Sequence, residues 1–334
     1  MRIGLIGTGR IGSFHAAALA RQADAGSLLL ADTDPARAAR LADRLGATAA
    51  PSVENIFTWG VDALVVACAT EGHAELVVRA VRAGLPVFCE KPVAPDLDRS
   101  LAVLREVAAV GGVLQLGFMR RFDAGYATAR ELVRSGALGR LHTVRTTTAD
   151  SSPPSAEYLA TSGGLFRDCL VHDFDMVRWV TGHEVVEVYA TGSDAGPPRF
   201  REVGDIDTGA AVLTLDDGTL VSSTGTRCNG AGYDVRMELA GELDQVSTGL
   251  DDRTPIASTE PQGPPPATKP WTGFLERFTP AYEAELAAFV QLVRGDGPNP
   301  CDGSEALAAL RVAEACERSR RERRRVTLEE LPDL

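Results

Sequence analysis

A glycine-rich turn near the start of the chain restricts the possible folds more than any other sequence feature. Apolar residues 2–6 predict a strand, residues 7–12 read GTGRIG, and residues 13–22 have helical periodicity. Glycines at this spacing allow a tight turn and let a pyrophosphate approach the N–H groups of a helix N-terminus. This context predicts a dinucleotide site whose residues are Gly7, Gly9, Arg10, Ile11 and Gly12.

Short apolar strands alternate with helices through the first third of the chain. Further strands are expected at 28–31, 63–67 and 86–89, and helices at 35–45, 74–83 and 97–110. Alternation of this kind implies right-handed βαβ crossovers and a parallel sheet. We therefore expect an α/β protein whose residues 1–119 form a doubly wound Rossmann domain that binds NAD.

The pattern changes near residue 120 to longer runs in which apolar and polar residues alternate. Strands are expected at 141–148, 185–191, 208–215, 220–226 and 235–240. Such alternation is typical of a sheet with one buried face, and Asp216-Asp217-Gly218 is typical of a hairpin turn. We expect residues 120–334 to form an α/β domain with a large, mostly antiparallel open sheet. Closing helices are expected at 281–293 and 304–321, and a long irregular loop at 251–270.

Composition narrows the range of partners. A chain of 334 residues usually divides into two domains, and its net charge of −12 repels nucleic acids and anionic membrane surfaces. The start of the chain does not resemble a secretory signal, and no apolar run approaches 18 residues, so a cytoplasmic location is expected. The six cysteines are scattered without a C-x-x-C pair, so no metal site is expected.

Asp32 is the residue from which we predict a preference between NAD and NADP. It follows Gly12 by 20 residues and ends the second predicted strand. A carboxylate at this point can accept hydrogen bonds from an adenosine ribose diol and repels a 2′-phosphate, so NAD is favoured over NADP. The alternative is that Asp32 is the N-cap of the helix that begins at Pro35.

Oxidation of an alcohol by hydride transfer requires a base for the hydroxyl proton and positive charge near the developing alkoxide. Lys91 follows a strand at the carboxyl edge of the predicted sheet, where such sheets bind ligands. His172 can take the proton, and Asp168 and Asp175 lie on the same side of a helix. Taken singly, these residues have other interpretations: a solvated lysine, a structural histidine, or acids at a helix start.

Four stretches of sequence carry a resemblance to a known family. They are the GTGRIG turn, the segment FCEKP at 88–92, the segment GFMRRFD at 117–123, and residues 163–179 with Arg167-Asp168 and His172-Asp173-Phe174-Asp175. The chain resembles the glucose–fructose oxidoreductase / inositol dehydrogenase family over nearly its whole length. Within that family it is most similar to the bacterial inositol 2-dehydrogenases.

The resemblance implies roles for individual residues. His172 would be the general acid/base, Lys91 would hold the reacting oxygen and the nicotinamide side, and Asp168 would orient them. Substrate-binding residues would be Arg120, Asp175 and Tyr233. Further cofactor-binding residues would be Thr70, His73, Glu90 and Lys91. The family commonly pairs subunits through the exposed sheet face, so a homotetramer or homodimer is implied.

Three functions are compatible with these features. The favoured one is NAD-dependent oxidation of a cyclitol, with myo-inositol converted to the 2-keto inositol or a close stereoisomer reacting in the same way. A sugar or glycoside dehydrogenase acting on a pyranose would use the same catalytic residues. A nucleotide-binding regulator without catalysis should lack the lysine or the histidine. Glu71 and the 251–270 loop depart from the family pattern and leave the polyol substrate open.

Overall fold

The computed structural model describes residues 1–334, apart from the side chain of Ala23. The chain forms two compact units that alternate along the sequence. Unit 1 comprises Met1–Phe122, Pro280–Leu307 and Asp333–Leu334, and unit 2 comprises Asp123–Thr279 and Ala308–Pro332. Residues 280–307 thus belong to unit 1, although everything from residue 120 onward was expected in the second domain. Hydrophobic burial explains the return of the chain, because Leu286, Phe289 and Val290 pack into the core of unit 1.

Unit 1 contains a parallel sheet of six strands in the order β3-β2-β1-β4-β5-β6. Its strands are β1 (Arg2–Ile6), β2 (Ser27–Ala31), β3 (Thr48–Ala49), β4 (Ala63–Val66), β5 (Val87–Glu90) and β6 (Leu114–Gly117). Every neighbouring pair is parallel, as expected for a Rossmann domain. The order reverses between β1 and β4, and open α/β sheets bind ligands beyond the carboxyl ends of the strands at such a point.

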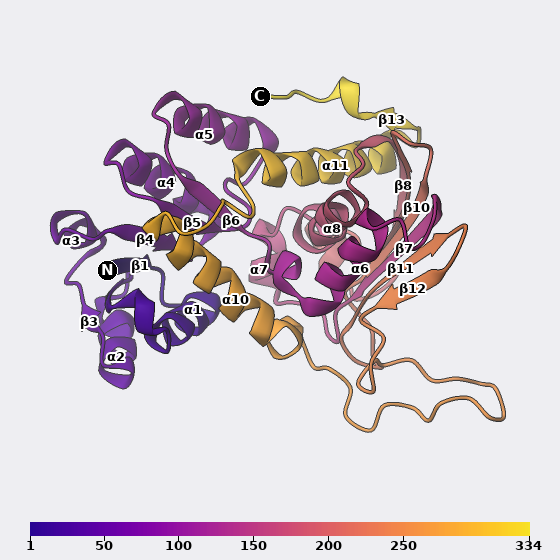
Figure 1. Cartoon of the computed structure of the whole chain (residues 1–334), viewed down its shortest axis with the longest axis horizontal. Coiled ribbons are helices and arrows are strands. Elements are labelled where there is room, and N and C mark those ends of the chain that lie inside the picture. The colour runs from indigo at the N-terminus through magenta and orange to yellow at the C-terminus, as the bar shows by residue number, and fades with distance from the viewer. The chain divides into compact units, whose positions relative to one another are not determined.

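Helices cover both faces of this sheet (Figure 1). They are α1 (Arg10–Ala20), α2 (Pro35–Leu45), α3 (Val53–Thr58), α4 (His73–Arg82), α5 (Leu97–Ala109) and the last part of α10 (Phe274–Arg294). Side chains of α1, α2 and α10 share one core with β1, whereas α4 and α5 pack together on the other face. The doubly wound arrangement expected from the sequence is confirmed.

Unit 2 contains a seven-stranded sheet in the order β12-β11-β7-β10-β9-β8-β13. Its strands are β7 (Leu141–Ala149), β8 (Val185–Ser193), β9 (Thr208–Leu215), β10 (Leu220–Thr226), β11 (Asp234–Gly241), β12 (Gln245–Thr248) and β13 (Val326–Thr327). The β7–β10 pair is parallel and the other neighbouring pairs are antiparallel. The predicted turn at Asp216–Gly218 connects the antiparallel strands β9 and β10, so the hairpin is confirmed.

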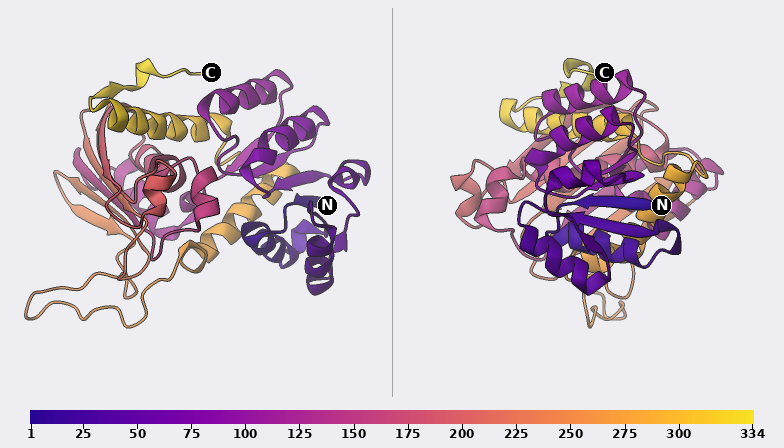
Figure 2. Two further views of the ribbon diagram at one scale, coloured as in Figure 1. Left: turned by 180° about the vertical axis from the view of Figure 1, so that it is seen from behind. Right: turned by 90° about the vertical axis from the view of Figure 1, so that its left-hand side faces the viewer.

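One face of the second sheet is covered by helices α6 (Ala124–Arg134), α8 (Val171–Thr181) and α11 (Gly303–Glu322) (Figure 2). Two short helices, α7 (Ala156–Thr161) and α9 (Arg199–Glu202), lie in loops of the same unit. Residues 251–270 have no helix or strand and extend away from the sheet, as expected (Figure 1). Among the described residues, no helix is both long and apolar enough to cross a membrane.

Candidate active site

The glycine turn joins β1 to α1, and its glycines meet different steric demands. Gly7 has a φ of +96°, and a Cβ there would lie 2.4 Å from backbone atoms of Cys68. A Cβ at Gly12 would lie 1.8 Å from the carbonyl oxygen of Gly7. A Cβ at Gly9 would meet no atom within 4 Å, and Gly9 caps α1 without a side-chain hydrogen bond. Open space before the first amides of a helix fits a pyrophosphate.

Asp32 lies at the carboxyl end of β2 with its carboxylate turned toward the glycine turn. Its Oδ2 accepts hydrogen bonds from the Thr8 amide (2.7 Å) and the Thr8 hydroxyl (2.8 Å), and its Oδ1 accepts one from the Asp34 amide (2.9 Å). Burial acts to raise the pKa of this carboxyl, but the hydrogen bonds and the Arg37 guanidinium outweigh it and lower the pKa. Asp32 is therefore ionised next to the turn.

The alternative role of Asp32 as a helix N-cap is wrong. The N-cap of α2 is Asp34, whose side chain accepts hydrogen bonds from the Ala36 and Arg37 amides. Asp32 lies two residues before the cap; its Oδ2 faces Thr8 and its Oδ1 accepts the Asp34 amide. Its carboxylate therefore contacts both the glycine turn and the residue that caps α2.

The loop after β4 carries three residues singled out in the sequence. Thr70 is half-buried in a short 3₁₀ turn (Thr70–Gly72), and Glu71 is exposed. The His73 ring is buried, with Nδ1 2.7 Å from the Pro92 carbonyl oxygen and Nε2 3.2 Å from the Cys68 carbonyl oxygen. His73 thus connects this loop to the turn that follows β5, and both of its ring nitrogens already have protein partners.

Glu90, the last residue of β5, pairs with a buried histidine that the sequence analysis did not identify. His15 of α1 is fully buried, and its Nε2 lies 2.6 Å from Glu90 Oε1. The His15 ring packs edge-on against Phe88 and Tyr282. The pair links the glycine-turn helix to the strand end that carries Lys91. Glu90 is separated from His15 by 75 positions, so no local pattern indicates the contact.

Lys91 is half-buried and follows β5 at the carboxyl edge of the sheet. It is one of only two lysines in the chain, because 32 of the 34 basic residues are arginines. An ammonium is a compact charge that can lose its proton, and a guanidinium cannot. The scarcity of lysine is therefore a further sequence signal in favour of the role predicted for Lys91.

In unit 2, Asp168 lies on a π-helical turn (Phe166–Leu170) that runs directly into α8. Turns of this kind are rare and concentrate at functional sites. The Tyr158 hydroxyl donates to Asp168 Oδ1 at 2.8 Å, and Arg227 Nη1 donates to Asp168 Oδ2 at 2.9 Å. Tyr158 and Arg227 were not predicted, because they lie 10 and 59 positions from Asp168.

The remaining predicted residues divide between the two units. His172 and Asp175 are buried in the first turns of α8, so the structure brings both onto the helical segment that carries Asp168. Tyr233 is buried just before β11, and its amide donates to the Trp271 carbonyl oxygen at 2.7 Å. Arg120 is buried in unit 1, in a short 3₁₀ turn (Met119–Phe122) after β6.

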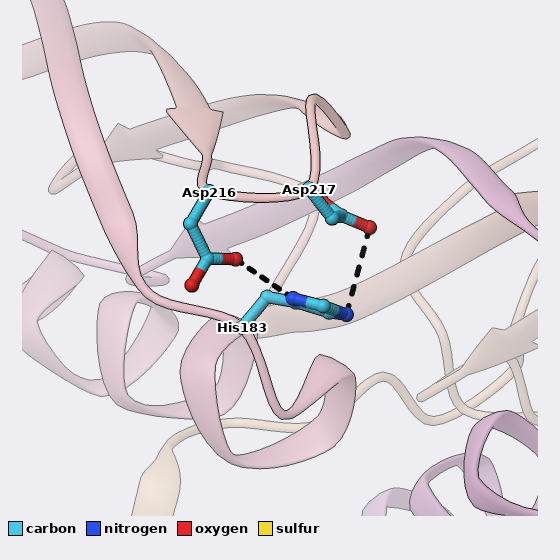
Figure 3. Close-up of side chains that lie close together, drawn as sticks. All are labelled: His183, Asp216 and Asp217. Carbon is cyan, nitrogen blue, oxygen red and sulfur yellow. Dashed lines mark hydrogen bonds and ion pairs between the residues drawn. The ribbon is translucent and has the colours of Figure 1, made fainter.

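One group of metal-ligand type, His183, Asp216 and Asp217, lies beside the β9–β10 hairpin (Figure 3). His183 Nδ1 is 2.7 Å from Asp216 Oδ1, and Nε2 is 3.6 Å from Asp217 Oδ2. The two ring nitrogens therefore face different carboxylates from opposite edges of the ring. These contacts hold the His183 side chain against the β9–β10 hairpin.

Fold and site together define a class. The chain is an oxidoreductase with an NAD-binding Rossmann domain and a second α/β domain that carries buried acids and a histidine. It belongs to the GFO/IDH/MocA family: residues 1–118 match the model of the oxidoreductase family with an NAD-binding Rossmann fold, and residues 126–246 match the GFO/IDH/MocA C-terminal domain. The family expected from the sequence is confirmed.

Curated relatives and solved structures extend over nearly the whole chain. The myo-inositol dehydrogenase Hyg17 of Streptomyces leeuwenhoekii is 39% identical, covering 96% of this chain and 97% of its own. A myo-inositol dehydrogenase structure from Corynebacterium glutamicum has a TM-score of 0.89 at 33% identity, covering 100% and 99%. A scyllo-inositol dehydrogenase structure from Lactobacillus casei, with bound NAD(H) and scyllo-inositol, has a TM-score of 0.86 at 27% identity, covering 98% and 99%.

Proposed function

We propose that this enzyme oxidises a ring hydroxyl of a cyclitol to the ketone, with myo-inositol or a close stereoisomer as substrate and NAD as hydride acceptor. The observation that carries the proposal is the helical segment on which Asp168, His172 and Asp175 follow one another, buried or nearly so. Two acids and one acid/base group suit a neutral ring with several hydroxyls. Relatives that act on inositols, covering nearly the whole chain, support the same substrate class.

The residues around the glycine turn fit NAD. Gly7, Gly9 and Gly12 would hold the pyrophosphate, together with the backbone at Arg10 and Ile11, because a side chain at Gly9 would fill space that protein packing leaves open. The Asp32 carboxylate would accept the adenosine ribose hydroxyls. Thr70, His73 and Glu90 would shape the nicotinamide side, with His73 and Glu90 acting mainly through the contacts that fix the loops after β4 and β5. Bound NAD supplies the hydride acceptor.

The other residues transfer the hydroxyl proton, stabilise the reacting oxygen and bind the remaining substrate hydroxyls. His172 takes the hydroxyl proton as general base and returns it in the reverse reaction. Lys91 stabilises the developing negative charge on the reacting oxygen, and Asp168 orients His172 and the substrate. Asp175, Tyr233 and Arg120 would pair with the remaining hydroxyls, since each buried hydroxyl without a partner weakens binding.

We further propose that the chain functions in the cytoplasm as a homotetramer or homodimer. The second sheet supports pairing of subunits, because its exposed face carries Tyr189 opposite Val212 on adjacent strands and Leu220 on the next. Large apolar side chains on an exposed sheet face mark association surfaces. Analytical ultracentrifugation of the wild type and of Val212→Lys tests this: a monomeric wild type would contradict it.

A substrate panel tests the proposed reaction. We expect kcat/KM to be highest for myo-inositol or scyllo-inositol, lower for glucose and a glucoside, and lowest for glucuronate, whose carboxylate would face Asp168 and Asp175. Production of NADH gives all five rates under one set of conditions. Preference for glucuronate would contradict the polyol assignment, whereas preference for the glucoside would retain the residues and replace the cyclitol by a pyranose.

A further inference from the structure

Arg227 is a fully buried cation next to Asp168. It follows β10, its side chain is 2% exposed, and its Nη1 donates to Asp168 Oδ2 at 2.9 Å. Its Nη2 lies 4.0 Å from Asp205 Oδ2. A buried guanidinium is costly unless carboxylates surround it, so the three side chains must fold as one charged unit. Removal of Arg227 leaves two buried acids without their counter-charge.

Tyr158 holds the other oxygen of the same carboxylate. Its hydroxyl donates to Asp168 Oδ1 at 2.8 Å, while the residue as a whole is 45% exposed on α7. The two oxygens of Asp168 therefore have donors from separate elements, which restricts rotation of the carboxylate. Asp205 continues the network back to the π-turn, because its Oδ1 accepts the Leu165 amide at 3.1 Å.

We propose that Arg227 and Tyr158 are positioning residues for the reaction, which hold the Asp168 carboxylate in one orientation on the helical segment that also carries His172. This inference rests on the proposed function, since Asp168 receives its role there. Charge-assisted hydrogen bonds are about twice as strong as neutral ones, so a carboxylate held at both oxygens is well fixed. Placement of reacting groups within a fraction of an ångström controls the rate.

The surroundings of Asp168 give the direction of a pH effect. Besides the donors Arg227 and Tyr158, the charged or titratable groups around the turn include Asp205, His172, the Arg167–Glu314 pair, the Cys169 thiol and Asp150, whose Oδ2 lies 3.6 Å from that thiol. Both donors favour the ionised carboxylate, and loss of either makes protonation easier. The acidic limb of kcat/KM against pH should therefore move to higher pH in Tyr158→Phe and further in Arg227→Met.

Two variants and one matched control test the inference. Tyr158→Phe removes one hydroxyl from a half-exposed residue and should lower kcat about ten-fold, the scale of a hydrogen bond to a charged group. Arg227→Met should lower kcat by roughly 10²-fold. The control is Arg167→Met, which breaks the bidentate pair of Arg167 with Glu314 on the same π-turn and leaves the donors of Asp168 in place. It should keep the wild-type pH profile.

A double-mutant cycle with Asp168→Asn decides whether Tyr158 and Arg227 act through Asp168 or only stabilise the fold. If Tyr158 and Arg227 act through Asp168, their replacement in the Asp168→Asn background changes kcat by less than about two-fold. Full additivity would overturn the positioning role. Wild-type rates in Asp168→Asn alone would instead overturn the role of Asp168 in the proposed function. If Arg227→Met does not fold, the Tyr158→Phe cycle and its pH profile decide alone.

Discussion

Replacement of Asp32 by alanine should weaken the preference for NAD over NADP, and the contacts of Asp32 give the size of the effect. The variant loses the hydrogen bond between a ribose hydroxyl of NAD and the Asp32 carboxylate, and a bond of this kind contributes about 1.5–3 kcal/mol. That range lowers kcat/KM for NAD by roughly 10- to 150-fold. Removal of the repelling charge favours NADP. Two charges 4 Å apart near a protein surface interact by about 4 kcal/mol, and screening by solvent and by the Arg37 guanidinium reduces this to about 2 kcal/mol, or roughly 30-fold.

The two effects multiply, so the ratio of kcat/KM for NAD to that for NADP should fall by roughly 10³-fold in Asp32→Ala. Steady-state kinetics with both cofactors and one polyol give the ratio directly. The wild type should prefer NAD. A wild type that prefers NADP would refute the assignment of Asp32.

A control is needed because Asp32 also accepts the Thr8 amide and hydroxyl, so alanine loosens the turn as well. Thr8→Val removes the hydroxyl bond and keeps the carboxylate. It should lower kcat/KM for both cofactors by the same factor and leave their ratio unchanged. If Asp32→Ala behaves in the same way as Thr8→Val, the carboxylate is only a structural acceptor.

Further predictions concern chemistry and stability. Lys91→Ala and His172→Ala should each lower kcat by roughly 10²-fold or more. NAD binding, measured by calorimetry, should survive in His172→Ala. Lys91→Arg should not restore the rate, because a guanidinium differs in shape and keeps its proton. His15→Leu should lower the free energy of unfolding, measured with urea, by about 1–3 kcal/mol, since Glu90 loses its buried partner. The pKa of Asp217 is lowered in the folded protein, so its ionised carboxylate stabilises the fold above pH 3.8, the ordinary pKa, and this contribution is lost as pH falls through the lower pKa of the folded state. The free energy of unfolding of Asp217→Asn should therefore depend less steeply on acidic pH. An unchanged slope would contradict this.

Elements with strong local signals could be predicted closely from the sequence. Helix α2 was expected at 35–45 and has those bounds, because Pro35 begins it and Gly46, with a φ of +67°, ends it. Strands β9 and β10 also match, since alternation along them is regular and the hairpin turn separates them. Where the pattern of apolar residues and the residues of the flanking turns indicate the same element, the sequence is sufficient to predict its bounds.

The sequence did not predict strand β6, which depends on a distant partner, or helix α6, which has a local signal. Strand β6 is four residues long and contains Gln115, which is fully buried because its amide donates to the Glu285 carbonyl oxygen. No local pattern predicts this contact, because Gln115 and Glu285 are 170 positions apart in the sequence. Helix α6 was missed although Asp123 caps it through the Gly125 and Tyr126 amides, so that signal was available.

The histidines show what the structure adds to the candidate site. Five are present in the sequence, and their residue type alone gives no order among them. In the structure, His15 is committed to Glu90, His73 to two carbonyl oxygens and His183 to the acids of the hairpin, while His142 is exposed on β7. The remaining one, His172, is buried on the segment that carries Asp168 and Asp175. Because His172 alone among the five shares a helical segment with Asp168 and Asp175, we expect the loss of rate in His172→Ala to exceed that in His73→Ala or His183→Ala.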